Sequence, residues 1–353
     1  MLDYATFRPL LFRLDPEVAH TVVEKSLAFT QYLPDLLNPL KVPSYTHDAL
    51  RQEFFGCTFL NPVGLAAGLD KNASMIEAMA GLGFGFTEIG TVTPRPQSGN
   101  PKPRLFRHVA QKTLQNAMGF NNDGMEIVAS RLSRGTPYSL PVGVNIGKNK
   151  LTPQENAIDD YTTLVARLHT FADYLVINIS SPNTPNLRDL QNEAFIQALF
   201  AQAKKLTTKP ILLKIAPDMS HADAIALCTF AVEAGADGII ATNTTIDHAL
   251  VPNPYDVGGL SGAVLCEKSF ALFDTVASAL FGKTLLISVG GISSGAEAYR
   301  RIRAGASLVQ LYSSLIFEGP MLVNRINQEL VALLARDGFE HISQAIGIDR
   351  EVR

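Results

Sequence analysis

The chain has 353 residues, of which 46% are apolar and 18% are charged, and its formal net charge is −3. This composition is sufficient for one large α/β domain, alone or with a small appendage. The near-neutral charge, without a lysine or arginine run, predicts no nucleic-acid partner. The three cysteines, Cys57, Cys228 and Cys266, are widely spaced, which indicates a reducing compartment and no disulfide framework. The chain shows no apolar run of transmembrane length and no signal or transit pattern, so we expect a cytoplasmic location.

The first 55 residues contain no glycine, whereas the remainder contains all 26. Apolar residues recur at helical spacing over residues 1–14, which predicts an amphipathic helix. A second helix is expected to begin with Asp15 as N-cap and Pro16 in the first helical position, and to run to about Leu33. Residues 36–43 form a proline-punctuated connector. We therefore predict a helical hairpin over residues 1–43, which either packs on the main domain or meets a membrane or lipophilic ligand with its apolar face.

After Gly56, short apolar segments alternate with amphipathic ones. Strands are predicted at residues 62–68, 86–92, 141–147, 174–180, 210–216, 238–244, 284–290 and 308–313. Helices are predicted at 73–82, 153–171, 192–206, 221–234, 267–280 and 295–304. This alternation predicts a (β/α)8 barrel over residues 44–353. An open doubly wound sheet is disfavoured because no G-x-G-x-x-G motif occurs.

Polar residues gather at the predicted strand ends, where barrel enzymes place their chemistry. Asn145, Asn178, Lys214 and Asn243 interrupt apolar strands, and buried polar groups of this kind are costly unless they are paired. The end of the strand at 174–180 and the loop after it carry Asn178, Ser180, Ser181, Asn183 and Thr184, with Pro182 and Pro185 stiffening the loop, which suits either a ligand site or an ordinary turn. Glycines and hydroxyls at the last two strands indicate a phosphate site. The histidines lack metal-ligand spacing and no G-x-S-x-G is present, so neither a metal site nor a serine hydrolase is expected.

Ten segments together resemble the dihydroorotate dehydrogenase family. They include AAGLDKN (66–72), NAMGFNN (116–122), VNIGKNK (144–150), INISSPNTPNLR (177–188), LKIAPD (213–218) and ASLVQLYS (306–313). The resemblance is closest to class 2 of that family, which contains FMN, reduces quinones and associates with membranes. The opening residues 7–20 resemble the helical extension that forms the quinone passage in class 2.

The resemblance implies a role for each matching residue. Ser181 matches the base that removes the C5 proton of dihydroorotate, and Thr184 or a water is our hypothesis for the proton relay. Class 1 has a cysteine in place of this serine, and no cysteine lies in this loop. FMN contacts are implied for Ala67, Gly68, Leu69, Asp70, Lys71, Thr91, Asn145, Asn178, Lys214, Thr242, Gly262, Gly291, Tyr312 and Ser313. Substrate contacts are implied for Lys71, Asn116, Ala117, Met118, Gly119, Phe120, Asn178, Asn183, Asn243 and Thr244.

One position departs from the family pattern. Ala117 stands where many relatives have arginine, and we expect position 117 to face away while Asn116 and backbone groups contact the substrate. The implied function is oxidation of dihydroorotate to orotate, with electrons passed to a membrane quinone, ubiquinone or menaquinone. The resemblance also implies a monomer that binds peripherally to the cytoplasmic side of the membrane. The alternatives are a soluble class 1 enzyme using fumarate or NAD, and a non-redox phosphate-binding lyase or isomerase.

Overall fold

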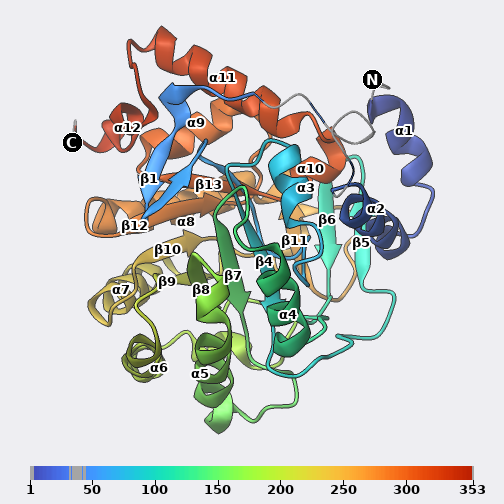
Figure 1. Ribbon diagram of the computed structural model, residues 1–353, viewed down its shortest axis with the longest axis vertical. Helices are drawn as coiled ribbons and strands as arrows, with labels where there is room; N and C mark the ends of the chain where they lie inside the picture. The colour runs from blue at the N-terminus through green and yellow to red at the C-terminus, as the bar shows by residue number, and fades with distance from the viewer. Residues whose placement is uncertain (1–3, 32, 34–41, 43–44, 352–353) are drawn as a thin grey trace.

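The computed structural model describes residues 4–31, 33, 42 and 45–351, and its centre is a closed barrel of eight parallel strands (Figure 1). In chain order these are β3 (Val63–Leu65), β4 (Phe86–Val92), β7 (Val142–Ile146), β8 (Tyr174–Asn178), β9 (Ile211–Ile215), β10 (Gly238–Ala241), β12 (Leu285–Val289) and β13 (Leu308–Leu311). Each strand pairs with its neighbours in this series, and β13 pairs with β3 to close the ring. Every predicted strand segment contains one of these strands, so the (β/α)8 prediction is confirmed.

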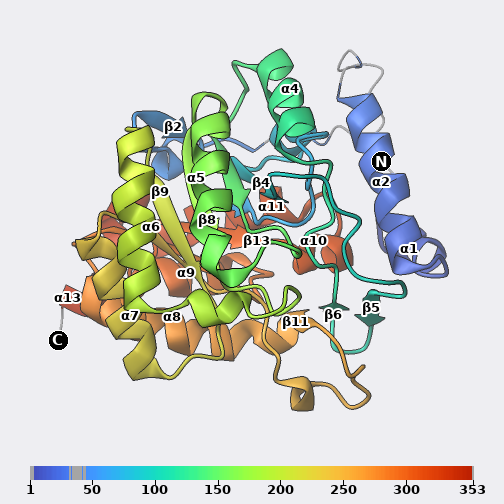
Figure 2. The ribbon, with the colours of Figure 1, turned by 90° about the horizontal axis from the view of Figure 1, so that it is seen from below.

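Helices surround the barrel on its outer face (Figure 2). They are α3 (Ile76–Gly81), α4 (Met125–Gly135), α5 (Ala157–Leu168), α6 (Glu193–Leu206), α7 (His221–Glu233), α8 (Cys266–Leu280), α9 (Gly295–Arg303), α10 (Ser313–Glu318), α11 (Leu322–Arg336), α12 (Ile342–Ala345) and α13 (Ile348–Glu351). In α5 the buried Tyr161, Leu164 and Leu168 lie on one face at helical spacing, as the pattern predicts. The prediction missed α4 and the four helices from α10 to α13.

Two small antiparallel sheets were not predicted. The hairpin of β1 (Gln52–Phe54) and β2 (Cys57–Phe59) places Phe59 against Phe86, with the ring centroids 5.4 Å apart. This contact fills the N-terminal end of the barrel with aromatic side chains. The second sheet has the order β11 (Gly259–Gly262), β6 (Thr113–Asn116) and β5 (Leu105–His108), and it stands beside the opposite end.

Side chains of a β-strand alternate between its two faces, and this alternation decides what fills the barrel. In β8, Tyr174 and Val176 belong to the interior cluster, whereas Leu175 and Ile177 belong to the core beneath the outer helices. Asn178 continues the inward series, and Lys214 lies beside it in register on β9. The same alternation therefore brings polar side chains from neighbouring strands together at the C-terminal end.

The N-terminal helices are α1 (Tyr4–Leu11) and α2 (Pro16–Thr30), and both views show them on the side of the barrel that carries β5 and β6 (Figures 1 and 2). Asp15 caps α2 by accepting hydrogen bonds from the backbone N–H groups of Glu17 and Val18, as predicted. Tyr4 donates to the carbonyl of Ile316 in α10 at 2.7 Å. The predicted connector 36–43 lies outside the described residues except for Val42. None of the described helices is long and apolar enough to cross a membrane.

Candidate active site at the C-terminal end of the barrel

A cavity lies at the C-terminal end of the barrel strands. Its walls come from the ends of β3, β4, β8, β9, β10, β12 and β13, from the loop after β6, and from α2 through His20. The cavity therefore lies where the chemistry of barrel enzymes is found. Most of its polar side chains belong to the strand-end residues that the sequence indicated.

A buried ion pair forms the floor beneath this cavity. The Lys214 ammonium lies 3.6 Å from a carboxylate oxygen of Glu88, and the two side chains are 5% and 0% exposed. Asn145 and Gln310 each donate a hydrogen bond of 2.7 Å to the same carboxylate. A charge removed from water in this way is tolerated only when it is paired and hydrogen-bonded. Glu88 therefore explains how Lys214 can stand inside the barrel.

Asn145 connects this floor to the cavity wall. Its amide nitrogen donates a hydrogen bond to Glu88, and its amide oxygen accepts hydrogen bonds from Thr91 at 2.5 Å and from Asn178 at 3.1 Å. Asn145 is fully buried and does not line the cavity, whereas Thr91 and Asn178 do. The side chain of Asn145 thus orients two residues that face the cavity.

The loop after β8 carries Ser181, which is 5% exposed and lines the cavity. The backbone N–H of Asn183 donates to its hydroxyl oxygen at 3.2 Å. Asn183 also donates from its side chain to Asn116 at 2.9 Å, which joins this loop to the end of β6. Among the described residues, no partner is found for the buried hydroxyls of Thr184 and Thr244 or for the amide oxygen of Asn183. Such unsatisfied groups are expected where a polar ligand completes the hydrogen bonding.

Gly262 at the end of β11 and Gly290 and Gly291 after β12 line one end of the cavity. At Gly262 and Gly291 the absence of a side chain lets other backbone segments approach closely. At Gly291, with φ +74°, an added Cβ atom would lie 2.5 Å from the Cα atom of Cys266. At Gly262, with φ +107°, it would lie 2.4 Å from the carbonyl oxygen of Lys112. Ser261 and Ser313 share a hydrogen bond of 2.8 Å beside them. Glycine-rich backbone with hydroxyl groups at this corner of a barrel fits a phosphate group.

Lys71 and His20 face each other across the side of the cavity towards α2. Burial lowers the pKa of Lys71 to about 8, against the opposing effect of Glu24 and Glu17. Burial, together with the Lys71 charge, lowers the pKa of His20 to about 3, although its hydrogen bond with the Leu69 carbonyl acts in the opposite direction. At neutral pH the imidazole is therefore uncharged, and Lys71 remains available to an anionic ligand.

Most of the residues implied by the family resemblance line the cavity. They are Ala67, Gly68, Lys71, Thr91, Asn116, Met118, Gly119, Phe120, Asn178, Ser181, Asn183, Lys214, Thr242, Asn243, Thr244, Gly262, Gly291, Tyr312 and Ser313. Asn145, Leu69, Asp70 and Ala117 are not part of the lining. The Asp70 carboxylate instead accepts backbone hydrogen bonds from residues 72, 74 and 75 and so holds the following loop. The backbone N–H and carbonyl of Ala117 bond to Arg104 and Asn100.

The sequence reasoning missed several residues around the cavity. Ser261 lines it, and Glu88 lies directly below it, whereas Gly90 and Gly290, which also line it, stand at predicted strand ends. A signal for Glu88 was present, because a carboxylate within the apolar strand FTEIGTV needs a buried partner. Ser261 gave no comparable signal, because β11 lies outside the barrel and was not predicted.

Comparison with known proteins identifies the family. The family described as dihydroorotate dehydrogenase matches residues 49–334. The dihydroorotate dehydrogenase (quinone) of Sulfurimonas denitrificans is 60% identical over 99% of this chain and 100% of its own length. The corresponding protein of Helicobacter acinonychis is 50% identical over 98% of this chain and 99% of its own length.

Solved structures agree with the sequence comparison. The ligand-free DHODH of Eimeria tenella superposes with a TM-score of 0.87 at 38% identity, covering 95% of this chain and 99% of that one. The same protein in complex with ferulenol gives a TM-score of 0.86 at 37% identity, covering 95% and 96%. The fold, the site at the barrel end and these full-length similarities show that the chain belongs to the dihydroorotate dehydrogenase family, a family of flavin-dependent oxidoreductases.

Proposed function

We propose that this chain oxidises dihydroorotate to orotate in pyrimidine biosynthesis, with FMN as its bound group and a membrane quinone as electron acceptor. The observation that carries the proposal is the cavity itself. It combines Ser181, amide and hydroxyl groups that lack partners within the described residues, and a glycine cradle suited to phosphate. Relatives at 60% and 50% identity bear the name dihydroorotate dehydrogenase (quinone). A soluble class 1 enzyme is disfavoured because the base position holds Ser181.

The residues at the two ends of this cavity fit the phosphate group and the ring system of FMN. When bound, it supplies an acceptor for hydride and a donor of electrons to a quinone. The cradle of Gly262, Gly290 and Gly291, with Ser313, would hold its phosphate, and Lys214, which lines the cavity, would supply a positive charge that stabilises the reduced flavin. A lyase or isomerase using Lys214 as a Schiff base is disfavoured, because the Lys214 ammonium is paired with Glu88.

Ser181 acts as the base that takes the C5 proton of dihydroorotate. The Asn183 backbone N–H holds the Ser181 oxygen at 3.2 Å and so limits the positions that it can take. Since serine is a weak base at neutral pH, the proton must be passed on. Thr184 is 3% exposed, and its hydroxyl has no partner among the described residues, which makes it the candidate relay.

The substrate is held by side chains around Ser181. Asn116, Asn178, Asn183, Asn243 and Thr244 offer amide and hydroxyl groups of the kind that recognise a planar ring with alternating donors and acceptors. Lys71 supplies the positive charge for the carboxylate, with the Met118–Phe120 segment closing the site beside it. An amide-rich cavity with the Lys71 ammonium at its side matches the chemistry of dihydroorotate.

The N-terminal helices form the quinone entrance and the membrane surface. Their exposed face carries large apolar side chains, among them Leu10 at 62% and Phe29 at 70% exposure. Exposed apolar residues on consecutive amphipathic helices are typical of a segment that lies in the membrane interface. We place the protein peripherally at the cytoplasmic side of the membrane, as a monomer, with residues 1–43 as the membrane unit and 44–353 as the catalytic domain.

Anaerobic mixing of the yellow holoenzyme with dihydroorotate tests the proposal. The flavin absorbance should bleach, and it should return when a ubiquinone analogue is added but not when fumarate is added. Ser181→Ala should bind orotate yet lose at least about 100-fold in the bleaching rate, the usual contribution of a positioned base. A purified protein without flavin, or one that dihydroorotate does not bleach, would refute the assignment.

A further inference from the structure

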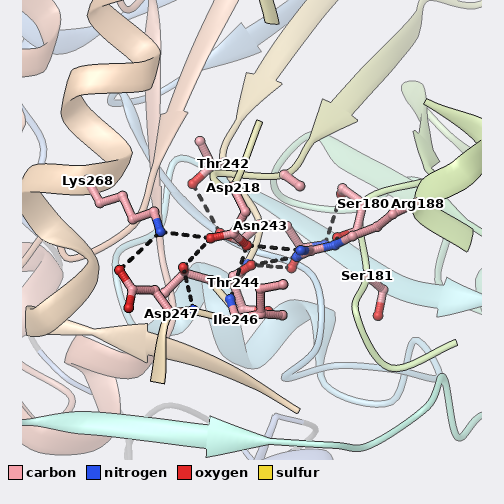
Figure 3. Close-up of polar contacts among 12 residues, drawn as sticks. Ser180, Ser181, Arg188, Asp218, Thr242, Asn243, Thr244, Ile246, Asp247 and Lys268 are labelled. Atoms are coloured by element: carbon pink, nitrogen blue, oxygen red, sulfur yellow. Dashed lines mark hydrogen bonds and ion pairs between the residues drawn. The ribbon is translucent and has the colours of Figure 1, made fainter. Parts of the chain in front are cut away.

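Arg188 joins three loops at the C-terminal end of the barrel without lining the cavity (Figure 3). It lies in a short 3-10 helix (Leu187–Leu190) that follows the Ser181 loop. Its Nε–H group donates to the carbonyl oxygen of Ser180 at 2.9 Å, and one terminal nitrogen donates to the carbonyl oxygen of Thr244 at 2.9 Å. Its other terminal nitrogen lies 2.9 Å from the Asp218 carboxylate.

The two carbonyl groups that Arg188 holds belong to the loops facing the substrate. Ser180 directly precedes Ser181, and Thr244 lines the cavity from the loop after β10, with a hydroxyl that has no hydrogen-bond partner in the described part of the chain. Asn243 adds a second link between these loops, because its amide donates to the Ser180 hydroxyl at 3.0 Å. Figure 3 shows the Ser181 side chain directed away from the guanidinium group. Arg188 thus acts on the backbone behind Ser181 and not on reacting atoms.

Asp218 anchors the guanidinium group to the rest of the barrel. It follows β9 and accepts hydrogen bonds from the Thr245 hydroxyl and from the backbone N–H of Ile246, the latter at 3.0 Å. Lys268 of α8 places its ammonium 2.9 Å from the same carboxylate. Burial alone would raise the pKa of Asp218, but these partners hold it below its ordinary value. Asp218 therefore remains a carboxylate at neutral pH, and the charge on Arg188 has a fixed counter-charge.

A planar guanidinium group is suited to this role. Its donors point in fixed directions from one rigid plane, so the three acceptors are held at fixed positions relative to one another. A lysine side chain has one flexible ammonium group and cannot reproduce that arrangement. The side chains of Arg188 and Asp218 are 19% and 15% exposed, respectively, so water competes little for these bonds.

We propose that Arg188, anchored by Asp218, is a positioning residue that sets the Ser181 hydroxyl against the substrate carbon from which it removes a proton. The inference rests on the proposed function, because it assigns Arg188 to the proton-abstraction step of that reaction. Displacing a catalytic group by about 1 Å can cost about 100-fold in rate. Arg188→Ala should therefore slow flavin reduction by about 10- to 100-fold. Flavin binding and reoxidation of the flavin by a quinone should remain intact.

The experiment compares Arg188→Ala, Arg188→Lys and Asp218→Asn holoenzymes with the native protein by anaerobic rapid mixing with dihydroorotate. The substrate is used unlabelled, deuterated at C5 and deuterated at C6. A misplaced base makes C5–H cleavage more rate-limiting, so the C5 isotope effect on flavin reduction should increase relative to the C6 effect. Arg188→Lys should recover little of the rate, whereas added guanidinium should partly restore Arg188→Ala. Arg167→Ala, which removes a partly exposed arginine of α5 paired with Glu126, serves as the matched control.

Orotate affinity, flavin content and reoxidation by a ubiquinone analogue are measured on the same preparations. They should stay within about threefold of native, because Arg188 bonds to backbone carbonyl groups of Ser180 and Thr244 and does not line the cavity. Flavin reduction by Arg188→Ala at the native rate, or a slower rate with an unchanged ratio of isotope effects, would overturn the inference. Should Arg188→Ala fail to fold, Arg188→Lys and Asp218→Asn decide by the same ratio. If the native protein itself is not reduced by dihydroorotate, the proposed function fails instead.

Discussion

Replacing Glu88 by glutamine tests whether the buried carboxylate stabilises the barrel by neutralising Lys214. The substitution retains the volume of the side chain and removes its charge. At 3.6 Å the attraction between two unit charges is about 4–5 kcal/mol at an effective dielectric constant of about 20. Removing one partner of a buried pair typically costs about 3–5 kcal/mol. Both routes predict a loss of about 3–5 kcal/mol in the free energy of unfolding.

The hydrogen bonds around position 88 can rearrange, so the charge dominates the expected effect. The amide oxygen of Gln310 has no partner among the described residues. A flipped Gln310 amide can therefore accept from the new glutamine, while Asn145 still donates to its oxygen. The loss in the free energy of unfolding should then come from the unpaired Lys214 ammonium and not from an amide group that lacks a hydrogen-bond partner.

A double variant separates these contributions. Glu88→Gln/Lys214→Met removes both charges and should be more stable than Glu88→Gln alone, because no unpaired buried charge remains. Urea unfolding followed by fluorescence, with and without excess FMN, gives the comparison. Glu126→Gln, which breaks an exposed pair with Arg167, should leave the unfolding midpoint unchanged. Equal losses in the single and double variants, or no loss in the single one, would refute the reasoning.

Three further predictions concern the cavity. Gly291→Ala should purify with little flavin, whereas the control Gly282→Ala should keep it. Both glycines have φ near +75°, but only at Gly291 does a backbone atom lie within 2.5 Å of the added Cβ atom. The ratio of flavin absorbance to protein concentration measures the flavin content. Orotate affinity should fall about tenfold per pH unit above the Lys71 pKa of about 8, because the Lys71 ammonium loses its charge as pH rises. Lys71→Met should abolish this pH dependence when orotate binding is titrated at a series of pH values. The pKa of His20 is about 3 in the folded chain and 6.5 when unfolded, so stability should decrease by about 1.4 kcal/mol per pH unit as pH falls between these values. His20→Gln should remove that part of the pH dependence of urea unfolding, and an unaltered profile would contradict the assigned pKa.

The sequence by itself determined the barrel, because its signals are local. Short apolar runs and helices of period 3.6 can be recognised within a short window of sequence, and eight alternations leave few other folds. Because the C-terminal ends of parallel barrel strands meet at one rim, the sequence alone also placed Asn178, Lys214 and Asn243 together there. The sequence did not predict the strands of the β1–β2 hairpin or those of the sheet formed by β5, β6 and β11. Several of their strands carry polar residues, as in QEF, LFRH and TLQN, so no continuous apolar run marks them, whereas the equally short β3 and β10 are apolar.

Only the tertiary structure decided which polar groups meet. Glu88 and Lys214 are 126 positions apart in the chain, and no local pattern indicates that barrel closure makes them an ion pair. The same holds for Arg188, whose three acceptors come from three different loops. For Asn145 the family resemblance implies a flavin contact, and only the fold shows that its amide also bonds to Glu88, Thr91 and Asn178. Periodicity fixes the face on which a side chain lies, but pairing across the barrel depends on register and closure, which arise only when all eight strands are in place.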